Sequence, residues 1–512
     1  MNRLITMLAG ADEARGHDTP LSKKETAVFL FGAAAVLALA FFLHLEFILF
    51  LVVIGVLGAL LVFQSPVAWI AVSILGFIPV FWNIEAGLTP PEIAHTFLYY
   101  GGLLWWFFHR VVIARKPLHW TIGGILAFLL FLQMAVLAPI SLGYGADPYV
   151  WIRELVILST VLMLVPVSHE CDTRTKQYIV VAALFITLSA LSVKNIYMYK
   201  QKVLEAVWLW QVGASRASET FYLVFTLAVL AAAPLIAARG KKWLVLWAAV
   251  FALGVSATII SFYRTVWVGA LAGYFFMGLM LGRIFWKRAI KYSVVALFLL
   301  AITYPFFLAE IVPLDVMWTS ISSRFESIGS YRTDVSVTNR EAEARAVLED
   351  TDGNWLLGKG LSTTVHFTKL TSMTSIEPTW THNGYAWILN HYGIIGSLLI
   401  FGSWISYIIL GLRTERRLRS ACWLTEDDRF RLRSFTAAIV AIIVSTFLIS
   451  LTINQFLSHE SGLVFGVLFG LLEAWSREEV KGSKGEEVKR LRSEEVKGLR
   501  GEEGVRISGK SI

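Results

Sequence analysis

Apolar residues run along this chain in long stretches that short polar links separate. Such runs differ from the alternation of half-buried strands and from the single apolar stripe of surface helices. A helix needs about 20 predominantly apolar residues to cross the hydrocarbon core of a bilayer. The pattern therefore predicts an all-α fold, a polytopic transmembrane helical bundle of about 12–14 spans. The segments lie approximately at 26–43, 46–63, 67–83, 94–113, 121–140, 150–168, 177–193, 219–237, 243–262, 265–282, 290–311, 385–411, 434–453 and 461–475.

Composition agrees with lipid as the main solvent of the chain. Hydrophobic residues make up 56% and charged residues 16% of the sequence, whereas soluble domains carry about 25% charged residues. The net charge of +8 does not indicate a nucleic-acid partner, because the basic residues form short clusters between apolar runs and no RNA-binding signature appears. We therefore expect a lipid bilayer as partner and no nucleic acid.

The basic clusters predict the orientation of the chain. Cytoplasmic loops of membrane proteins carry an excess of Lys and Arg, and alternate loops collect nearly every cluster here. We expect that side to be the cytoplasm, with both termini inside. The clusters contain Lys23, Lys24, Arg110, Arg115, Lys116, Arg174, Lys176, Arg239, Lys241, Lys242, Arg283, Lys287, Arg288, Lys291 and the arginines between Arg413 and Arg433.

The chain divides into three parts. A polar cytoplasmic segment covers 1–24, the transmembrane domain covers 25–475, and a charged tail covers 476–512. The tail repeats Glu-Glu-Val-Lys without apolar residues that would form a core, which predicts disorder or marginal helix.

The longer polar connections lie on the side opposite the basic clusters, and the largest covers 312–384. A connection of that length is too long for a turn, and it either carries function or forms a structural cap. Within this large periplasmic loop, Thr338-Asn339 before Arg340 predicts a capped short helix that ends near Asp352-Gly353.

Arginines on this side form the first group of candidate residues. Arg264 lies at the boundary of a span, where a guanidinium is costly unless it pairs or reaches the interface. It is therefore either a functional residue or an interfacial arginine. The planar fork of arginine suits diphosphate recognition, although ordinary solvated charge balanced by nearby Glu and Asp residues explains single arginines equally well. The set in the polar connections is Arg216, Arg324, Arg332, Arg340 and Arg345.

His382 is the second candidate, in the sequence Thr381-His382-Asn383-Gly384 directly before a span. Histidine titrates near neutral pH, so His382 can take a proton from a hydroxyl nucleophile. The alternative is a histidine that makes structural hydrogen bonds.

The order of these features resembles the shared module of the bacterial O-antigen ligase, O-antigen polymerase and exopolysaccharide polymerase superfamily. The resemblance covers roughly 210–410. It rests on Tyr263-Arg264 at the start of a span, Asn339-Arg340 in the loop, Leu356-Leu357-Gly358-Lys359-Gly360, His382-Asn383, and Gly393-Ile394-Ile395-Gly396. Tyr263 stands where that family commonly has Ser.

The resemblance implies a metal-independent transferase of the bacterial inner membrane that uses no cofactor. It takes a glycan from an undecaprenyl-diphosphate carrier on the periplasmic side and passes it to an acceptor hydroxyl. Arg264 and Arg340 would bind the donor diphosphate with help from Arg216, and His382 would orient or deprotonate the acceptor. Asn383 and Arg345 would support them.

Several readings remain open. The acceptor is lipid A-core for a ligase or another carrier-linked glycan for a polymerase, and the shared motifs do not separate the two. A lipid-linked oligosaccharide transporter is the alternative of another class, and an inactive scaffold is a further one. Transporters tend to show internal repeats and polar groups near the membrane midplane. Here the nearest intramembrane charge pair, Arg153-Glu154, falls near the outer end of its span.

Overall fold

The computed structural model of this protein describes residues 64–82, 89–205, 220–303, 335–351, 353–369, 374–422, 424–456 and 460–477, with isolated positions within 53–62, 318–322 and at 458. Several sequence predictions lie outside the described residues. They are the segment 1–24, the span 26–43, most of the span 46–63, the tail beyond 477, and Arg216, Arg324 and Arg332.

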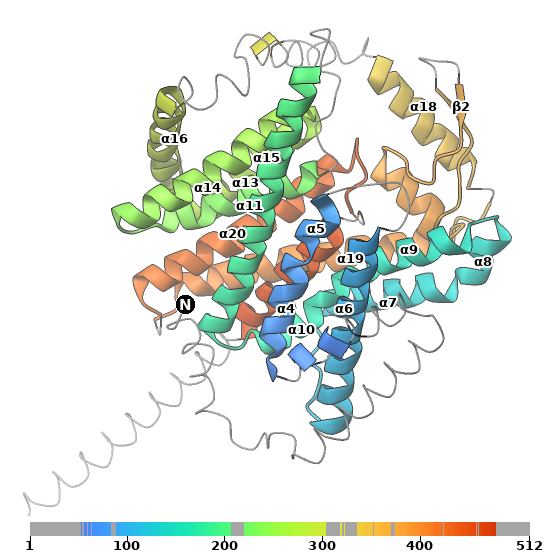
Figure 1. Ribbon diagram of the computed structural model, residues 1–512, viewed down its shortest axis with the longest axis horizontal. Helices are drawn as coiled ribbons and strands as arrows, with labels where there is room; N and C mark the ends of the chain where they lie inside the picture. The colour runs from blue at the N-terminus through green and yellow to red at the C-terminus, as the bar shows by residue number, and fades with distance from the viewer. Residues whose placement is uncertain are drawn as a thin grey trace, which may run out of the picture.

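The described chain is mostly helical (Figure 1). The helices before the large loop are α4 (Pro66–Leu75), α5 (Phe77–Trp82), α6 (Pro90–Phe108), the π-helix η2 (His109–Ile113), α7 (Ile122–Val136), α8 (Ala138–Gly143), α9 (Pro148–Ser159), the 3₁₀-helix η3 (Thr160–Met163), α10 (Leu164–Glu170), α11 (Arg174–Glu205), α13 (Phe221–Ala237), α14 (Lys241–Ile260), α15 (Arg264–Leu281) and α16 (Arg283–Thr303). After them come α18 (Val335–Glu349), strands β1 (Phe367–Lys369) and β2 (Thr374–Ile376), α19 (Gly384–Arg419), α20 (Glu426–Ile449) and a helix over 460–477.

Six of the described helices are long and apolar enough to cross a membrane. This length and composition fit the predicted multi-pass membrane protein, while the larger number of spans and their orientation stay predictions. The six are Pro148–Glu170, Arg174–Lys202, Lys241–Ile260, Arg264–Leu281, Gly384–Arg419 and Glu426–Ile449, and shorter apolar helices cover Pro66–Trp82, Ile122–Val136 and Phe221–Ala237.

Helix α15 has one exposed apolar face and one buried face. Val268, Leu271, Phe275 and Leu279 lie on one stripe and are 48%, 66%, 52% and 59% exposed. Large apolar side chains exposed in a row along a helix are unfavourable in water but match the hydrocarbon of a bilayer. The opposite face of the helix is buried against α20.

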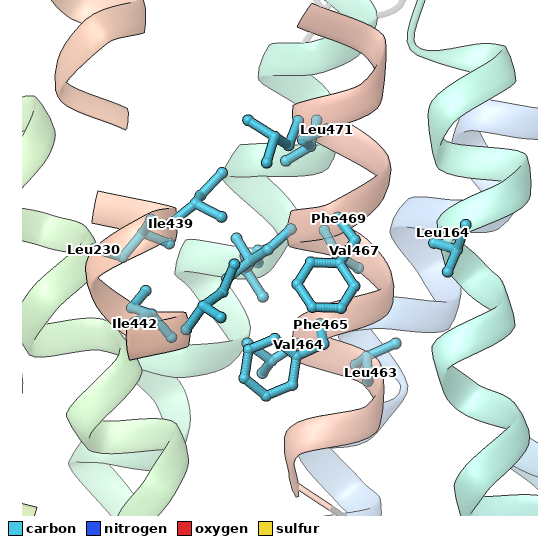
Figure 2. Packing of buried hydrophobic residues seen from close by; sticks show 14 of the residues in the cluster. Leu164, Leu230, Ile439, Ile442, Leu463, Val464, Phe465, Val467, Phe469 and Leu471 are labelled. Carbon is cyan, nitrogen blue, oxygen red and sulfur yellow. The ribbon is translucent and has the colours of Figure 1, made fainter. Parts of the chain in front are cut away.

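The centre of the bundle contains helices that are apolar on every side. A helix of that kind is buried all round, and every residue of α13 from Phe221 to Ile236 is buried. The helix over 460–477 is buried from 460 to 475. Figure 2 shows its side chains between Leu164 of α10 and the side chains of Leu230 and Ile439. Gly466 and Gly470 allow its backbone to approach η3 and α10 closely, because a Cβ at either position would lie 2.8 Å or less from a carbonyl oxygen or a valine carbon.

The described part of the large loop packs on one end of the bundle, which we call the loop end. Helix α18 contacts α19 and strand β1 there (Figure 1). The strands pair antiparallel, with Phe367 opposite Ile376. The predicted capped helix is wrong in its start, since α18 begins at Val335 and places Thr338 and Asn339 inside the helix. Capping preferences are weak compared with the packing of a helix face against its neighbour.

Candidate functional site

The imidazole of His382 lies against helix α18. Its Nδ1 is 2.8 Å from Oε2 of Glu343, and the His382 backbone N–H donates to Oε1 of the same carboxylate at 3.3 Å. The Glu343 side chain is 6% exposed and that of His382 is 45% exposed. A buried acceptor thus holds one edge of a ring that is only partly exposed to solvent.

Arg340 lies on the same face of α18 as Glu343. Residues three apart are neighbours on a helix surface, so half-buried Arg340 is one helical turn from the partner of His382. Arg345 is exposed, and its position two residues after Glu343 turns it toward another side of the helix. Its predicted supporting role stays a prediction.

Asn383 fixes the start of α19 directly after His382. Its Oδ1 accepts from the backbone N–H of Tyr385 at 3.1 Å and of Ala386 at 3.0 Å. This is an N-cap, which satisfies donors that have no partner within the helix. The Gly384 N–H donates to the carbonyl of Ser450 at 2.9 Å. These contacts hold the backbone that carries His382.

Arg264 is the first residue of α15 and is half-buried. The hydroxyl of the next residue, Thr265, lies 2.5 Å from the hydroxyl of Thr452. Since Ser450 bonds to the start of α19, the turn 450–454 borders the starts of both α15 and α19. Arg264 and His382 therefore lie on elements that meet at this turn.

Helix α19 is broken at Gly393, whose φ is 63° and ψ is −169°. A break leaves backbone donors without a helical partner. The large loop supplies acceptors for them: Ile394 N–H donates to the carbonyl of Trp355 at 2.8 Å, and Ile395 N–H donates to that of Leu356 at 3.2 Å.

The loop also donates to the other side of the break. The N–H of Lys359 bonds to the carbonyl of Asn390 at 2.8 Å, and that of Gly360 bonds to the carbonyl of His391 at 2.9 Å. The ammonium of Lys359 pairs with Asp350 of the loop at 3.0 Å. We call residues 355–360 and 390–395 the loop–helix staple. Two sequence motifs of the predicted module thus bind each other through their backbones.

A surface cavity of about 350 Å³ lies beside the staple, lined by Ile140, Gly143, Tyr144 and Asn354. The Lys359 ammonium stands 5.1 Å from the centroid of the Tyr144 ring. This distance is within the range of a cation–π interaction.

The neighbouring charges Arg153 and Glu154 do not act as a pair. Arg153 bonds to Glu92 of α6 at 3.3 Å, and Glu154 accepts from the backbone N–H of Ser362 at 2.8 Å. Both contacts tie separate elements together. Glu154 in particular anchors the loop to the bundle just after the staple.

Two features of the site were not found from the sequence. Glu343 is one of the nearby Glu residues expected only to balance the loop arginines, and the sequence predicts no role for the turn 450–454. Helix periodicity places Glu343 on the Arg340 face, but nothing in the sequence selects it over Glu341 or Glu349 as the partner of His382.

Within the described residues, no group of three or more His, Cys, Asp or Glu side chains is placed to hold a metal ion. The fold and the site define a helical membrane protein with a polar site at its loop end. No protein-family model matches the chain, and a search of curated proteins finds no match.

Proposed function

We propose that this protein is a membrane glycan transferase that moves a glycan from an undecaprenyl-diphosphate carrier to an acceptor hydroxyl, in the manner of an O-antigen ligase. The site faces the periplasm from the bacterial inner membrane, and both termini are cytoplasmic. The observation that carries the proposal is the half-exposed imidazole of His382, held by a buried carboxylate one helical turn from Arg340.

The chemistry needs only a base and a stabilised leaving group. The His382 ring takes the proton of the acceptor hydroxyl, and the acceptor oxygen forms a bond to the anomeric carbon of the donor sugar. The bond from that carbon to the diphosphate oxygen breaks, and the diphosphate keeps the electron pair. Arg264 and Arg340 stabilise the resulting charge, which fixed cations do without reorganising during the reaction. Arg216, outside the described residues, assists in binding the diphosphate.

A polymerase uses the same donor and the same groups, and differs only in its acceptor. A lipid-linked oligosaccharide transporter needs no proton acceptor, so the contact between His382 and Glu343 does not favour it. The carrier-linked species that accumulates in a mutant distinguishes the ligase from the polymerase.

The test is complementation of a deletion in the protein's own host. Wild type, His382→Ala, Arg264→Ala and Arg340→Ala are expressed at matched membrane levels, and surface polysaccharide and carrier-linked glycan are measured. We expect each variant to lose surface glycan while full-length carrier-linked chains accumulate. A general base contributes about 10²–10⁴-fold, and removing either arginine removes stabilisation of the leaving diphosphate. Single repeat units would instead indicate a polymerase.

His366→Ala is the matched control, since the side chain of this loop histidine is 76% exposed and pairs with Glu377 at 3.2 Å. It should keep wild-type surface glycan. Normal glycan in well-expressed His382→Ala would refute the assignment of the base.

A further inference from the structure

We propose that Glu343 is a positioning residue that holds His382 in the tautomer with the proton on Nδ1 and the lone pair on Nε2. The inference rests on the proposed function, because it specifies which nitrogen receives the acceptor proton. It follows from the two contacts that one carboxylate makes with one residue.

The direction of the hydrogen bond sets the tautomer. An ionised carboxylate only accepts hydrogen bonds, so the 2.8 Å contact from Nδ1 to Oε2 of Glu343 requires a proton on Nδ1. In a neutral imidazole the other nitrogen then carries the lone pair. The carboxylate engages Nδ1 and the His382 side chain is 45% exposed, so an acceptor hydroxyl would meet the ring at Nε2.

The second contact fixes the position of the ring. The His382 backbone N–H donates to the other oxygen of the carboxylate, Oε1, at 3.3 Å. Glu343 therefore binds His382 at both its main chain and its ring. This arrangement restricts both the backbone before Asn383 and the rotation of the imidazole.

Helix α18 is itself held in place on the Glu343 face. Residues 343, 347 and 350 follow the i, i+4, i+7 spacing of one helix face. Val347 packs with Val365 and Ala386 in a buried apolar cluster, and Asp350 forms its ion pair with Lys359 of the staple.

The charged groups assigned to the site with His382 come from two helices. Glu343 and Arg340 are on α18, and Arg264 starts α15 across the turn 450–454. Of these, Glu343 bonds directly to the imidazole, at Nδ1. The carboxylate also stabilises the positive charge that the ring gains when Nε2 takes a proton.

The variant Glu343→Gln separates positioning from simple packing. Glutamine has nearly the same shape, but its amide N–H₂ is a donor. With its oxygen accepting from the His382 main chain, the amide N–H₂ faces Nδ1 and favours the tautomer with the proton on Nε2. That tautomer has no lone pair at the open nitrogen.

The first measurement is turnover by purified full-length protein in lipid nanodiscs, followed as release of undecaprenyl diphosphate. The donor probe is carrier-linked glycan extracted from the deletion strain, with the host's own membrane lipids as acceptor source. We expect Glu343→Gln to lower kcat by about 10²-fold or more with little change in the donor KM. Glu343→Asp should recover part of the loss because it restores an acceptor. Glu349→Gln, an exposed position on the same helix, should match wild type.

The second measurement reads the tautomer without turnover. Nitrogen-15 NMR of histidine-labelled protein, with the His382 signal assigned by its loss in His382→Gln, should show a protonated Nδ1 in wild type and a protonated Nε2 in Glu343→Gln. A wild-type signal with the proton on Nε2 would overturn the inference even if every Glu343 variant failed to fold.

The inference and the proposed function fail in different ways. If His382→Ala abolishes turnover while Glu343→Gln keeps wild-type kcat, Glu343 is only structural and the proposed base stands. If His382→Ala itself keeps wild-type turnover, the proposed base is wrong whichever tautomer the ring adopts.

Discussion

The break in α19 gives the sharpest test of the loop's attachment to the bundle, through the substitution Gly393→Ala. Its backbone, at φ 63° and ψ −169°, lies in a region that glycine alone adopts without strain. A Cβ there would stand 2.5 Å from both the Gly358 nitrogen and the Leu356 carbonyl oxygen. Both are backbone atoms, so no side-chain rotation relieves the contact.

The magnitude follows from what the substitution disrupts. Strain of this kind costs on the order of 1–3 kcal/mol, and a backbone hydrogen bond contributes about 0.5–1.5 kcal/mol net. The staple contains four such bonds. If alanine straightens α19 and releases the loop, the docked state is destabilised by about 4 kcal/mol, which raises the open fraction by about three orders of magnitude.

Hydrogen exchange of the Lys359 and Gly360 amides is the assay. These N–H groups bond to carbonyls of α19, so their exchange in Gly393→Ala should accelerate by about 10³-fold. Gly402→Ala is the control in the same helix, because its Cβ would meet only the flexible end of Leu126 at 3.1 Å. Unchanged protection of the two amides in Gly393→Ala would refute the reasoning.

Two further predictions concern the opposite end of the bundle and the orientation. The side chain of Glu415 is 3% exposed and binds Arg433 at 2.8 Å. Glu415→Ala should lower the free energy of unfolding by about 3 kcal/mol, because it leaves a half-buried guanidinium without its carboxylate. Thermal unfolding in detergent measures this loss, and Arg417→Ala, at an exposed position, is the control. Equal melting temperatures for Glu415→Ala and wild type would contradict the prediction. An impermeant thiol reagent should label exposed Cys422 only after the cytoplasm is opened, but should label Ser375→Cys in intact spheroplasts. The reverse labelling would invert the orientation.

Sequence reasoning located helices better than it located their contacts. The apolar runs at 243–262 and 265–282 correspond to α14 and α15, because a membrane-spanning helix needs only a local composition. The predicted span 385–411 covers most of α19 (Gly384–Arg419), including the break at Gly393. Its break depends on acceptors that come from a distant part of the chain, which local apolar patterning does not report.

The candidate site shows the same limit. His382, Arg340 and Arg264 stood out by residue type and by position next to apolar runs. Glu343 did not, since its role comes from a tertiary contact to His382. Arg153 and Glu154, adjacent in sequence, bind partners on different elements because successive residues point to different sides of a helix.

The buried helix over 460–477 has a consequence for how the protein is made. It occupies the centre of the bundle, yet it follows α4 through α20 in the chain. Until residues 460–477 have been synthesised, the earlier helices therefore lack the apolar partner that covers their buried faces. A chain that stopped before residue 460 would lack the helix that packs against α10, so the apolar surface that this helix covers would remain exposed.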